Sequence, residues 1–397
     1  MAEIWIINPY ASPPAYGWPS RSFHIAKELK NRGHIVTVFS FTGSHYLHLK
    51  NDIKPRKSPE QIEGINFVWL PSIRFFKDSL IIRWLNWYLF NFFFRNFINK
   101  NKCKAPVSVL FSIPSVHHLD LIKVLKNRYP SMRSTLEMRD LWPLSVSELS
   151  KKSNKHFFIR HLKKKEILAV KEIDRIVGLQ PGIKEYIKRD HPYFSIDKVH
   201  FIPHTIDSVK LDKSEIVYDF IYCGTLSRAN DLDTFLDALI RLESEKVFFN
   251  VLIIGAGSSC MRLKKKADKL RNTQVKPWMQ RSDVLQNISK AKVCVDGLLN
   301  LPMYQFGFSR LKWVDYMAMG KPILVSYSGS PIDVPIDKIG WQVPAENVDS
   351  MAIKIVEIFE NQDEIDMKGV KAQDWVYKNR AIDLWGGHYE DILLEKN

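Results

Sequence analysis

The sequence "FGFSRLKWVDYMAMGKPI", residues 306–323, carries charged residues where a helix could bind an anion. Its pattern predicts a helix with Ser309 as N-cap and Gly320 as the stop signal. Arg310 and Lys312 then fall in the first turn, where the helix dipole already contributes about half a positive charge. An acidic side chain would be stabilising there. The two cations therefore predict that the start of this helix meets an anion supplied by a ligand.

Two further segments place glycine where a predicted strand gives way to a helix. In "YCGTLSRANDLD", Gly224 could let a phosphate approach the backbone and Arg228 could add charge, but an ordinary turn with a solvated arginine fits equally well. In "IIGAGSS", Gly255 and Gly257 lack the third glycine and the later acidic residue of a dinucleotide fingerprint. A nicotinamide cofactor is therefore not expected, and this turn is weak evidence for a nucleotide.

Charged residues also follow predicted strands in the first half of the chain. In "NPYASPPAYGWPSR", Gly17 and Arg21 flank a helix start that could hold an anion, although the loop could equally be a lid or a surface connection. In "LEMRDLWPLS", Arg139 and Asp140 end a strand, where charges often point into a cleft. A structural Arg–Asp pair is the alternative.

Other sets of catalytic residues are not evident. No Ser/His/Asp set, Cys/His pair or metal cluster has a convincing spacing, and His117 and His118 are less informative because one of them fits a solvated helix position. The cysteines are far apart, which argues against a disulfide framework or a zinc site and favours a reducing compartment. They are Cys103, Cys223, Cys260 and Cys294.

The composition of the whole chain predicts a globular protein with acidic partners. Its 397 residues are too many for one ordinary core, so two domains of similar size are expected. The net charge of +15 favours nucleic acid, an anionic membrane surface or phosphorylated substrates. The start, "MAEIWIINPY", lacks the basic region of a signal peptide and reads as a buried strand, so a cytoplasmic location is expected.

Alternating apolar runs and helical patterns predict an α/β fold built from parallel sheets. Runs such as "IWIIN" and "VSVLFS" in the first half, and "DFIYCG" in the second, are expected strands. A polar linker near residues 205–216 would separate domains 1–206 and 207–397, and the amphipathic C-terminal helix could close the second domain or return to the first. Two doubly wound, Rossmann-like domains facing each other would bind ligands in a cleft at their strand ends.

The most aromatic segment, residues 78–100, predicts a helix at a membrane interface. Its uncharged stretch of eleven residues, between Arg83 and Arg95, is shorter than the roughly 20 residues of a span. A helix buried between layers is the alternative, but its Asn and Arg residues would make burial costly. The basic segment 151–166 suits anionic lipid or a solvated helix. The residues expected at the membrane are Arg83, Trp84, Trp87, Tyr88, Phe92, Phe93 and Phe94.

With these residues in view, the chain resembles the retaining glycosyltransferases of family 4, which have the GT-B fold. Within that family it is most similar to the WbuB-like branch, bacterial enzymes that add amino sugars in O-antigen and capsule assembly. The similarity runs nearly end to end. The segments that carry it are "SFHIAKELKNRGHIVTVFS", "EMRDLWP", "DRIVGLQPGIKEYI", "FIYCGTLSRANDLDTFLDA", "LIIGAG" and, most specifically, "GFSRLKWVDYMAMGKPIL".

The resemblance implies that the second domain binds a nucleotide-sugar and the first binds the acceptor. Asp315 matches the second acid of the family's pair and would hold the ribose hydroxyls, while Arg139, Asp140 and Lys312 would be catalytic candidates. The residues implied to lie by the donor are Gly17, Gly224, Thr225, Gly255, Gly257, Pro277, Trp278, Ser309, Arg310, Leu311 and Lys312.

The chain departs from the broad family pattern at three positions. The first acid of the pair falls at Gly307, and the two phosphate-binding cations fall at Thr225 and Asn230. Missing positive charge near the diphosphate would have to come from other residues. The candidates are Arg228, Arg310 and Lys312.

The function implied is retaining transfer of a hexose, favoured as an N-acetylated amino sugar, from a UDP- or GDP-sugar to a polyprenyl-diphosphate-linked acceptor. No cofactor or metal is expected beyond the nucleotide-sugar itself, with a UDP-sugar favoured. The enzyme would sit peripherally on the inner face of the cell membrane, without a nucleic-acid partner. The alternatives are a nucleotide-sugar 2-epimerase of the same fold and a degenerate, non-catalytic partner that binds a sugar nucleotide or a lipid.

Overall fold

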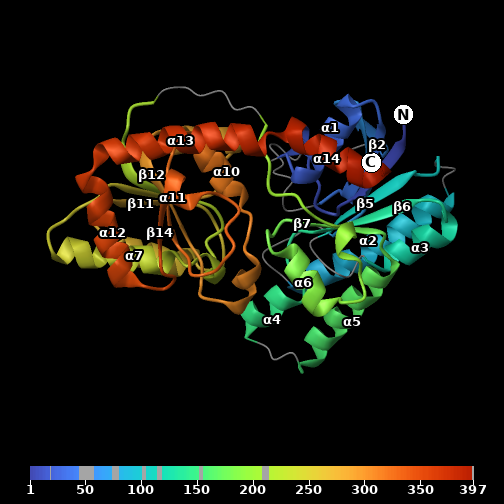
Figure 1. Cartoon of the computed structure of the whole chain (residues 1–397), viewed down its shortest axis with the longest axis horizontal. Helices are drawn as coiled ribbons and strands as arrows, with labels where there is room; N and C mark the ends of the chain where they lie inside the picture. The colour runs from blue at the N-terminus through green and yellow to red at the C-terminus, as the bar shows by residue number, and fades with distance from the viewer. Residues whose placement is uncertain are drawn as a thin grey trace. The chain divides into compact units, whose positions relative to one another are not determined.

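The computed structural model describes residues 1–17, 19–43, 58–73, 80–100, 104–113, 119–151, 155–207 and 214–395. The chain divides into two compact units (Figure 1). The first unit comprises Met1–Pro203 and Ile382–Asn397, and the second comprises His204–Ala381. The linker expected near residues 205–216 falls beside this division, and residues 208–213 of it lie outside the described part.

An eight-stranded sheet forms the centre of the first unit, in the order β3-β4-β2-β1-β5-β6-β7-β8. Neighbouring strands are parallel except β3 and β4, which are antiparallel. The strands are β1 (Glu3–Ile7), β2 (Ile35–Phe41), β3 (Glu60–Ile62), β4 (Ile65–Leu70), β5 (Ser108–Ile113), β6 (Arg133–Met138), β7 (Arg175–Gly178) and β8 (Val199–Phe201). The middle strands are continuous apolar runs because helices cover both of their faces.

Helices cover both faces of this sheet. α1 (Arg21–Asn31) and α14 (Ile382–Leu394) share one hydrophobic cluster with β1, β2 and β4, so the C-terminal helix lies beside α1 although most of the chain separates them (Figure 1). The aromatic helix α2 packs on Phe39 and Phe41 of the opposite face. The other helices are α2 (Leu80–Lys100), α3 (Asp120–Arg128), α4 (Leu144–Ser150), α5 (Phe157–Glu172) and α6 (Ile183–Asp190).

The second unit contains a six-stranded parallel sheet in the order β11-β10-β9-β12-β13-β14. Its strands are β9 (Tyr218–Cys223), β10 (Val251–Ile254), β11 (Thr273–Lys276), β12 (Ala291–Gly297), β13 (Ile323–Ser326) and β14 (Gly340–Val343). This is the Rossmann order 3-2-1-4-5-6, in which the chain reverses direction across the sheet between its first and fourth strands, here β9 and β12. The predicted α/β class with two Rossmann-like, parallel-sheet domains is confirmed.

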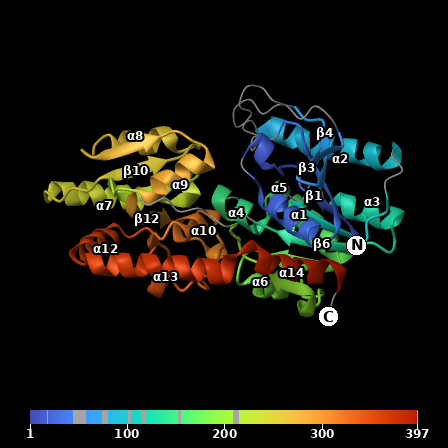
Figure 2. The same ribbon diagram turned by 90° about the horizontal axis from the view of Figure 1, so that it is seen from above.

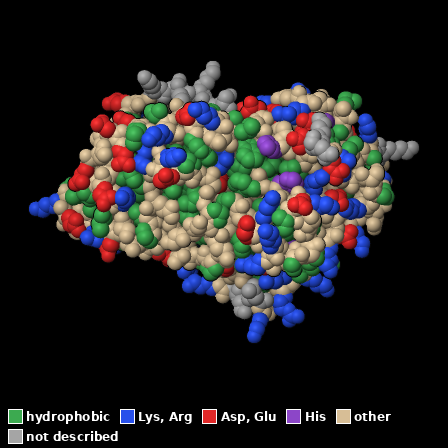
Figure 3. Space-filling view, viewed as in Figure 1, with side chains coloured by type: hydrophobic (Ala, Val, Ile, Leu, Met, Phe, Trp, Pro, Cys, Tyr) green, Lys and Arg blue, Asp and Glu red, His purple; other side chains and the backbone are tan. Residues whose placement is uncertain are grey.

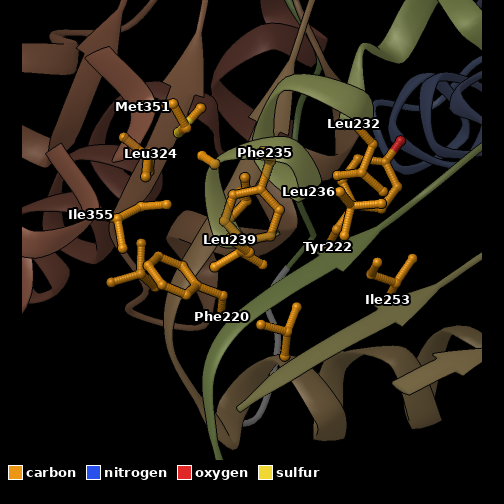
Figure 4. Packing of buried hydrophobic residues seen from close by; sticks show 14 of the residues in the cluster. Phe220, Tyr222, Leu232, Phe235, Leu236, Leu239, Ile253, Leu324, Met351 and Ile355 are labelled. Atoms are coloured by element: carbon orange, nitrogen blue, oxygen red, sulfur yellow. The ribbon is translucent and has the colours of Figure 1, made fainter. Parts of the chain in front are cut away.

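One core of the second unit lies between its sheet and α7 and α12. Phe220 and Tyr222 of β9 point toward Leu232, Phe235 and Leu236 of α7 (Figure 4). Figure 2 shows α12 and α13 as long neighbouring helices of the same unit. The helices are α7 (Leu232–Ser244), α8 (Cys260–Ala267), α9 (Arg281–Ser289), α10 (Leu311–Ala318), α11 (Ile336–Ile339), α12 (Val348–Glu360) and α13 (Gln362–Arg380).

Candidate anion-binding site

The candidate site lies at the switch point of the second sheet. β9 and β12 are hydrogen-bonded neighbours, and ligands of open α/β sheets bind beyond the carboxyl ends of such a strand pair. Gly224 directly follows β9, and Asp296 lies at the end of β12. α10 meets both strand ends, because Trp313 in its first turn bonds Asp296 and Tyr316, further along, bonds the backbone of Cys223.

Asp296 is the anion that Arg310 and Lys312 meet within the protein. Its side chain is 0% exposed and accepts Arg310 Nη1 at 3.0 Å on each oxygen, Lys312 Nζ at 2.9 Å and Trp313 Nε1 at 2.7 Å. Burial opposes its ionisation, but the two cations hold the pKa of Asp296 below its usual value. The protein thus supplies one anion of its own to these two cations, and the ligand anion expected from the sequence stays a prediction. Sequence reasoning missed Asp296, whose only signal is an acid within the apolar run "KVCVDGL".

Lys312 is the most perturbed cation of this site. Its side chain is 15% exposed, and its Nζ donates to the Tyr222 hydroxyl at 3.0 Å and lies 4.3 Å from the centre of that ring. Burial lowers the pKa of Lys312 to about 8, although Asp296 acts in the opposite direction. The ammonium therefore carries its proton at neutral pH and loses it in mildly alkaline solution.

Arg310 is the N-cap of α10, so the prediction that Ser309 caps this helix is wrong. The Ser309 hydroxyl accepts the backbone N–H of His204 at 3.0 Å and is also hydrogen-bonded to the carboxylate of Asp333. Arg310 bonds Asp296 through Nη1 alone, and its Nε and Nη2 atoms bond none of the residues that the structure describes. No side chain caps the first turn of α10. The Trp313 N–H donates to the Arg310 carbonyl at 3.2 Å, but the N–H groups of Leu311 and Lys312 bond none of the described residues and could bind an anion.

The turn after β9 places Thr225 at the candidate site, and its backbone carbonyl and N–H have different roles. The Thr225 carbonyl accepts the Tyr222 hydroxyl at 2.9 Å and Asn230 Nδ2 at 2.6 Å. Its own N–H donates to none of the described residues, so it adds to the free donors. Arg228 is exposed at the start of the short helix that follows.

Gly255 and Gly257 belong to the packing of two adjacent turns. A Cβ at Gly255 would lie 1.9 Å from the Gly224 carbonyl oxygen, and one at Gly257 would lie 2.3 Å from that of Leu226. Since no side chain fits at either position, glycine is required there whether or not a ligand binds.

Asp315 lies on the buried side of α10 and forms an ion pair with Arg281, the first residue of α9. Burial raises the pKa of Asp315, while Arg281 opposes that effect. Arg281 was not identified from the sequence. Trp278, in the loop before α9, and Leu311, in the first turn of α10, are 37% and 41% exposed. Gly307 has φ of 71° and ends the short helix Pro302–Phe306.

The first unit holds the remaining candidates. Asp140 is exposed and Arg139 is half-buried, and the Arg139 carbonyl accepts Gln180 Nε2 at 3.0 Å. Gly17 follows the short helix Pro14–Tyr16 with φ of 156°. His117 and His118 lie outside the described residues.

Arg21 does not hold an external anion, contrary to the prediction. It is buried and bonds Glu137 at 2.8 Å, the carbonyls of Ile202 and Pro203 at 3.0 and 2.6 Å, and the Tyr389 hydroxyl at 2.8 Å. Its donors therefore serve the fold, because they tie α1 to β6, to the end of the first unit's main segment and to α14.

The aromatic helix α2 has one buried and one exposed face. Phe90, Phe94 and Ile98 are buried, as is Trp87, whose Nε1 donates to the Tyr10 hydroxyl at 2.8 Å. Trp87 and Phe94 therefore cannot contact a membrane, which corrects the prediction for these two residues. Exposed large residues are Leu85, Tyr88 and Phe92, while Phe93 is half-buried; the side chains of Arg83 and Trp84 lie outside the described part.

The polar residues of α2 did not prevent its burial. Asn86 is fully buried, and its side chain bonds the backbone N–H and carbonyl of Ile73 at 2.7 and 2.8 Å. Its donor and acceptor are thus satisfied, which removes the cost that argued against a buried helix. None of the helices in the described ranges is long and apolar enough to cross a membrane.

Basic and apolar side chains share the exposed face of α5. Phe157, Arg160, Lys164 and Leu168 recur every three or four residues, and all are exposed, Phe157 by 78% and Leu168 by 52%. In Figure 3, Lys and Arg side chains gather over the edge of the first unit that carries α5. Across the described ranges, no group of three or more His, Cys, Asp or Glu residues could hold a metal ion.

Comparison with solved structures shows the same fold over the full chain. Sucrose-phosphate synthase from Thermosynechococcus elongatus matches with a TM-score of 0.75 and 14% identity, covering 100% of both chains. HepE of Anabaena, solved in complex with UDP-glucose, matches with a TM-score of 0.68 and 12% identity, also over 100% of both chains. A glycosyltransferase from Rickettsia africae ESF-5 matches with a TM-score of 0.65 and 14% identity, over 100% of this chain and 99% of the other.

The sequence comparisons add the enzyme class. A search of curated proteins finds no match. Residues 218–361, which begin with β9 and include the whole of α10, match the family model described as glycosyl transferases group 1. This match covers the strand ends and the helix start that form the candidate anion-binding site. Residues 218–361 of the second unit are thus similar to group 1 glycosyl transferases, and the chain is a glycosyltransferase.

Proposed function

We propose that the chain is a retaining glycosyltransferase of the family 4, WbuB-like type that uses a nucleoside diphosphate sugar as donor. The observation that carries this proposal is the set of donors at the switch point: Arg310, Lys312, the first-turn amides of α10 and the N–H of Thr225. One carboxylate, Asp296, faces two cations, so the cluster keeps a net charge of about +1. A diphosphate would complete it.

A UDP-sugar is the favoured donor, with a GDP-sugar as the alternative. HepE, which has the same fold, is solved with UDP-glucose. Asp315 would bind the ribose hydroxyls, and Arg281 would hold its carboxylate in place. Trp278 is exposed enough to lie against a base.

The transfer needs no base from the protein. The bond between the anomeric carbon and the diphosphate oxygen breaks, and the acceptor hydroxyl forms its bond to that carbon on the same face. The hydroxyl proton passes to the leaving diphosphate. Arg310, Lys312 and the helix amides would stabilise the charge that develops on the leaving group. Asp140 and Arg139 stay candidates for contacts to the reacting sugars.

The proposed acceptor is a sugar on a polyprenyl diphosphate, as in O-antigen or capsule assembly, and the sugar transferred is an N-acetylated hexosamine. The net charge of +15 and the exposed face of α5 support a peripheral position on the inner face of the cell membrane. α5 fits this role better than α2, because its exposed face carries two cations between two apolar residues.

Turnover tests the proposal. The full chain is incubated with UDP- and GDP-hexosamines and with polyprenyl-diphosphate saccharides, and nucleotide release and the anomeric configuration of the product are measured. Acceptor-dependent release with retained configuration is expected, and Lys312→Ala should abolish it. Lys378→Ala, at an exposed lysine of α13, is the control. An isomerised donor would indicate the epimerase, and binding without turnover would indicate a non-catalytic partner.

A further inference from the structure

Most donors to the carboxylate of Asp296 come from one segment of the chain, and the N–H of the next residue, Gly297, adds one more at 2.9 Å. Both of its oxygens are bonded to Arg310, and one of them also accepts Lys312 while the other accepts Trp313. The segment 310–313 is the N-cap and first turn of α10. One buried side chain of β12 thus bonds three of the four residues 310–313 at the helix start.

Burying Asp296 with two cations costs folding free energy, which suggests that the arrangement serves function rather than stability. A buried ion pair rarely stabilises a protein more than apolar residues of the same volume would, because the charges lose their hydration. Two cations at the positive end of a helix also repel each other and the dipole. Asp296 offsets this repulsion but cannot cancel it, since it carries one charge against two.

The donors that remain are those a diphosphate could use. Arg310 keeps Nε and Nη2, which bond nothing in the described ranges, and Lys312 has given two of its three ammonium protons, to Asp296 and Tyr222. Each side chain is 15% exposed, so neither is sealed inside the fold.

We infer that Asp296 is a positioning residue for the donor site: it fixes Arg310 and Lys312 at the switch point so that their remaining donors bind the donor's diphosphate. This inference rests on the proposed function. Asp296 would touch neither the substrate nor the reacting atoms. In the broad family pattern the two phosphate-binding cations lie in the turn after β9. Here the cations lie at the start of α10 instead, and Asp296 on β12 anchors them there.

The pH dependence of UDP binding distinguishes a positioning role of Asp296 from a purely structural one. The groups that face Lys312 are Asp296 on β12, Arg310 before α10, and Tyr222 and Cys223 on β9. Of these, Asp296 is the one that favours the ammonium most strongly, while Arg310 disfavours it. Removing the charge of Asp296 should therefore move the deprotonation of Lys312 to lower pH, which a loss of packing alone would not do.

The test measures UDP binding to the full chain by calorimetry between pH 6 and 9. Asp296→Asn keeps the shape and an acceptor for Trp313 but removes the charge. It should weaken UDP binding at pH 7.5 by about tenfold or more, as outer-shell partners of ligand groups do. The alkaline midpoint of binding should also move to lower pH. Asp219→Asn is the matched control, because Asp219 pairs with Lys292 and lies at the opposite, amino-terminal end of β9.

A second comparison covers the case in which Asp296→Asn weakens UDP binding only because it destabilises the fold. Lys312→Met removes one of the two buried cations, so Asp296→Asn in that background leaves less unpaired charge. If Asp296 acts through the cations, it costs less UDP affinity in the Lys312→Met background than in the natural chain. An equal cost in both would overturn the inference.

The outcomes separate the two proposals. Wild-type protein that binds neither UDP nor GDP would overturn the proposed function and this inference together. Wild-type protein that binds UDP, with an Asp296→Asn variant of the same affinity and the same pH midpoint, would overturn the inference alone.

Discussion

A Cβ at Gly224 would lie 3.2 Å from both Cε and Nζ of Lys312. The turn after β9 and the cation on α10 are therefore in direct contact, with φ of 155° at Gly224 adding a backbone conformation that other residues rarely adopt. A side chain at this position requires the Lys312 side chain, which is bonded to Asp296 and Tyr222, to shift by a few tenths of an ångström.

Gly224→Ala is therefore expected to weaken UDP binding by about tenfold or more, because it moves a charged donor of the site. It should also lower the free energy of unfolding by about 1 kcal/mol or more through backbone strain. Gly33→Ala is the control: Gly33 also has positive φ, of 89°, but a Cβ there meets nothing within 4 Å. The control should lose stability and keep its UDP affinity. Equal affinity of the Gly224 variant would contradict the contact.

UDP binding should depend on pH through Lys312. With a pKa of about 8, the ammonium is about one-tenth protonated at pH 9, so UDP affinity should fall by roughly tenfold between pH 7 and 9. Lys312→Arg keeps the charge over this range and should flatten the profile. Calorimetry in two buffers of different ionisation enthalpy checks the sign, because binding at pH 8.5 should take up protons. Proton release there would contradict the assignment.

The same group affects stability with a definite sign. The pKa of Lys312 is lower in the folded chain than its ordinary value of 10.5, so the unfolded chain binds more protons between about pH 8 and 10.5. Its contribution to stability is therefore present in full above 10.5 and is lost as the pH falls through 8. Lys312→Met should remove this part of the stability profile, as measured by chemical denaturation at several pH values.

Arg21 and Glu137 should be among the most sensitive positions of the first unit. Their side chains are 4% and 0% exposed, and Glu137 also accepts hydrogen bonds from Ser112 and Tyr389. Arg21→Ala leaves a buried carboxylate unpaired, so it should lower the free energy of unfolding by about 3–5 kcal/mol. Arg189→Ala, at an exposed arginine paired with Asp190, should cost less than about 1 kcal/mol. Chemical denaturation measures the free energy of unfolding of both variants. If Arg21→Ala costs as little as Arg189→Ala, the pair of Arg21 and Glu137 does not stabilise the fold.

Acid should lower the stability that the pair of Arg21 and Glu137 contributes to the first unit. Burial opposes ionisation of Glu137, but Arg21, Ser112 and Tyr389 hold its pKa below the ordinary 4.5. Its contribution is therefore complete above 4.5 and is lost as the pH falls through the lower, folded value.

The sequence was sufficient for features that depend on neighbouring residues. A strand, a glycine and a helix start are local patterns, so the turn at Gly224 and the helix that contains Asp315 could be predicted. Asp296 could not, because its partners are 14 and 16 residues away and only the packing of α10 against the end of β12 brings them together. The same reason explains Arg21, whose partner Glu137 is 116 residues distant.

The aromatic helix shows a different limit of sequence reasoning. Its apolar residues surround the helix, so composition cannot tell a buried face from an exposed one. The decisive fact is that the amide of Asn86 finds both a donor and an acceptor on Ile73. That partner is 13 residues away in the chain and is not implied by any pattern in the helix itself.

Membrane binding, finally, should depend on α5. Arg160→Glu combined with Lys164→Glu reverses two exposed cations that lie between Phe157 and Leu168 on one face. Each cation near an anionic surface contributes about 1 kcal/mol, so the double variant should bind vesicles with anionic lipid at least roughly thirtyfold more weakly. Lys264→Glu with Lys265→Glu makes the same charge change on the exposed surface of α8 and should leave vesicle binding nearly unchanged. Co-sedimentation with vesicles of neutral and anionic composition measures both. If the two double variants lose binding equally, net charge rather than the face of α5 determines adsorption. If Phe92→Ser on α2 has the larger effect, the interfacial helix is α2 instead.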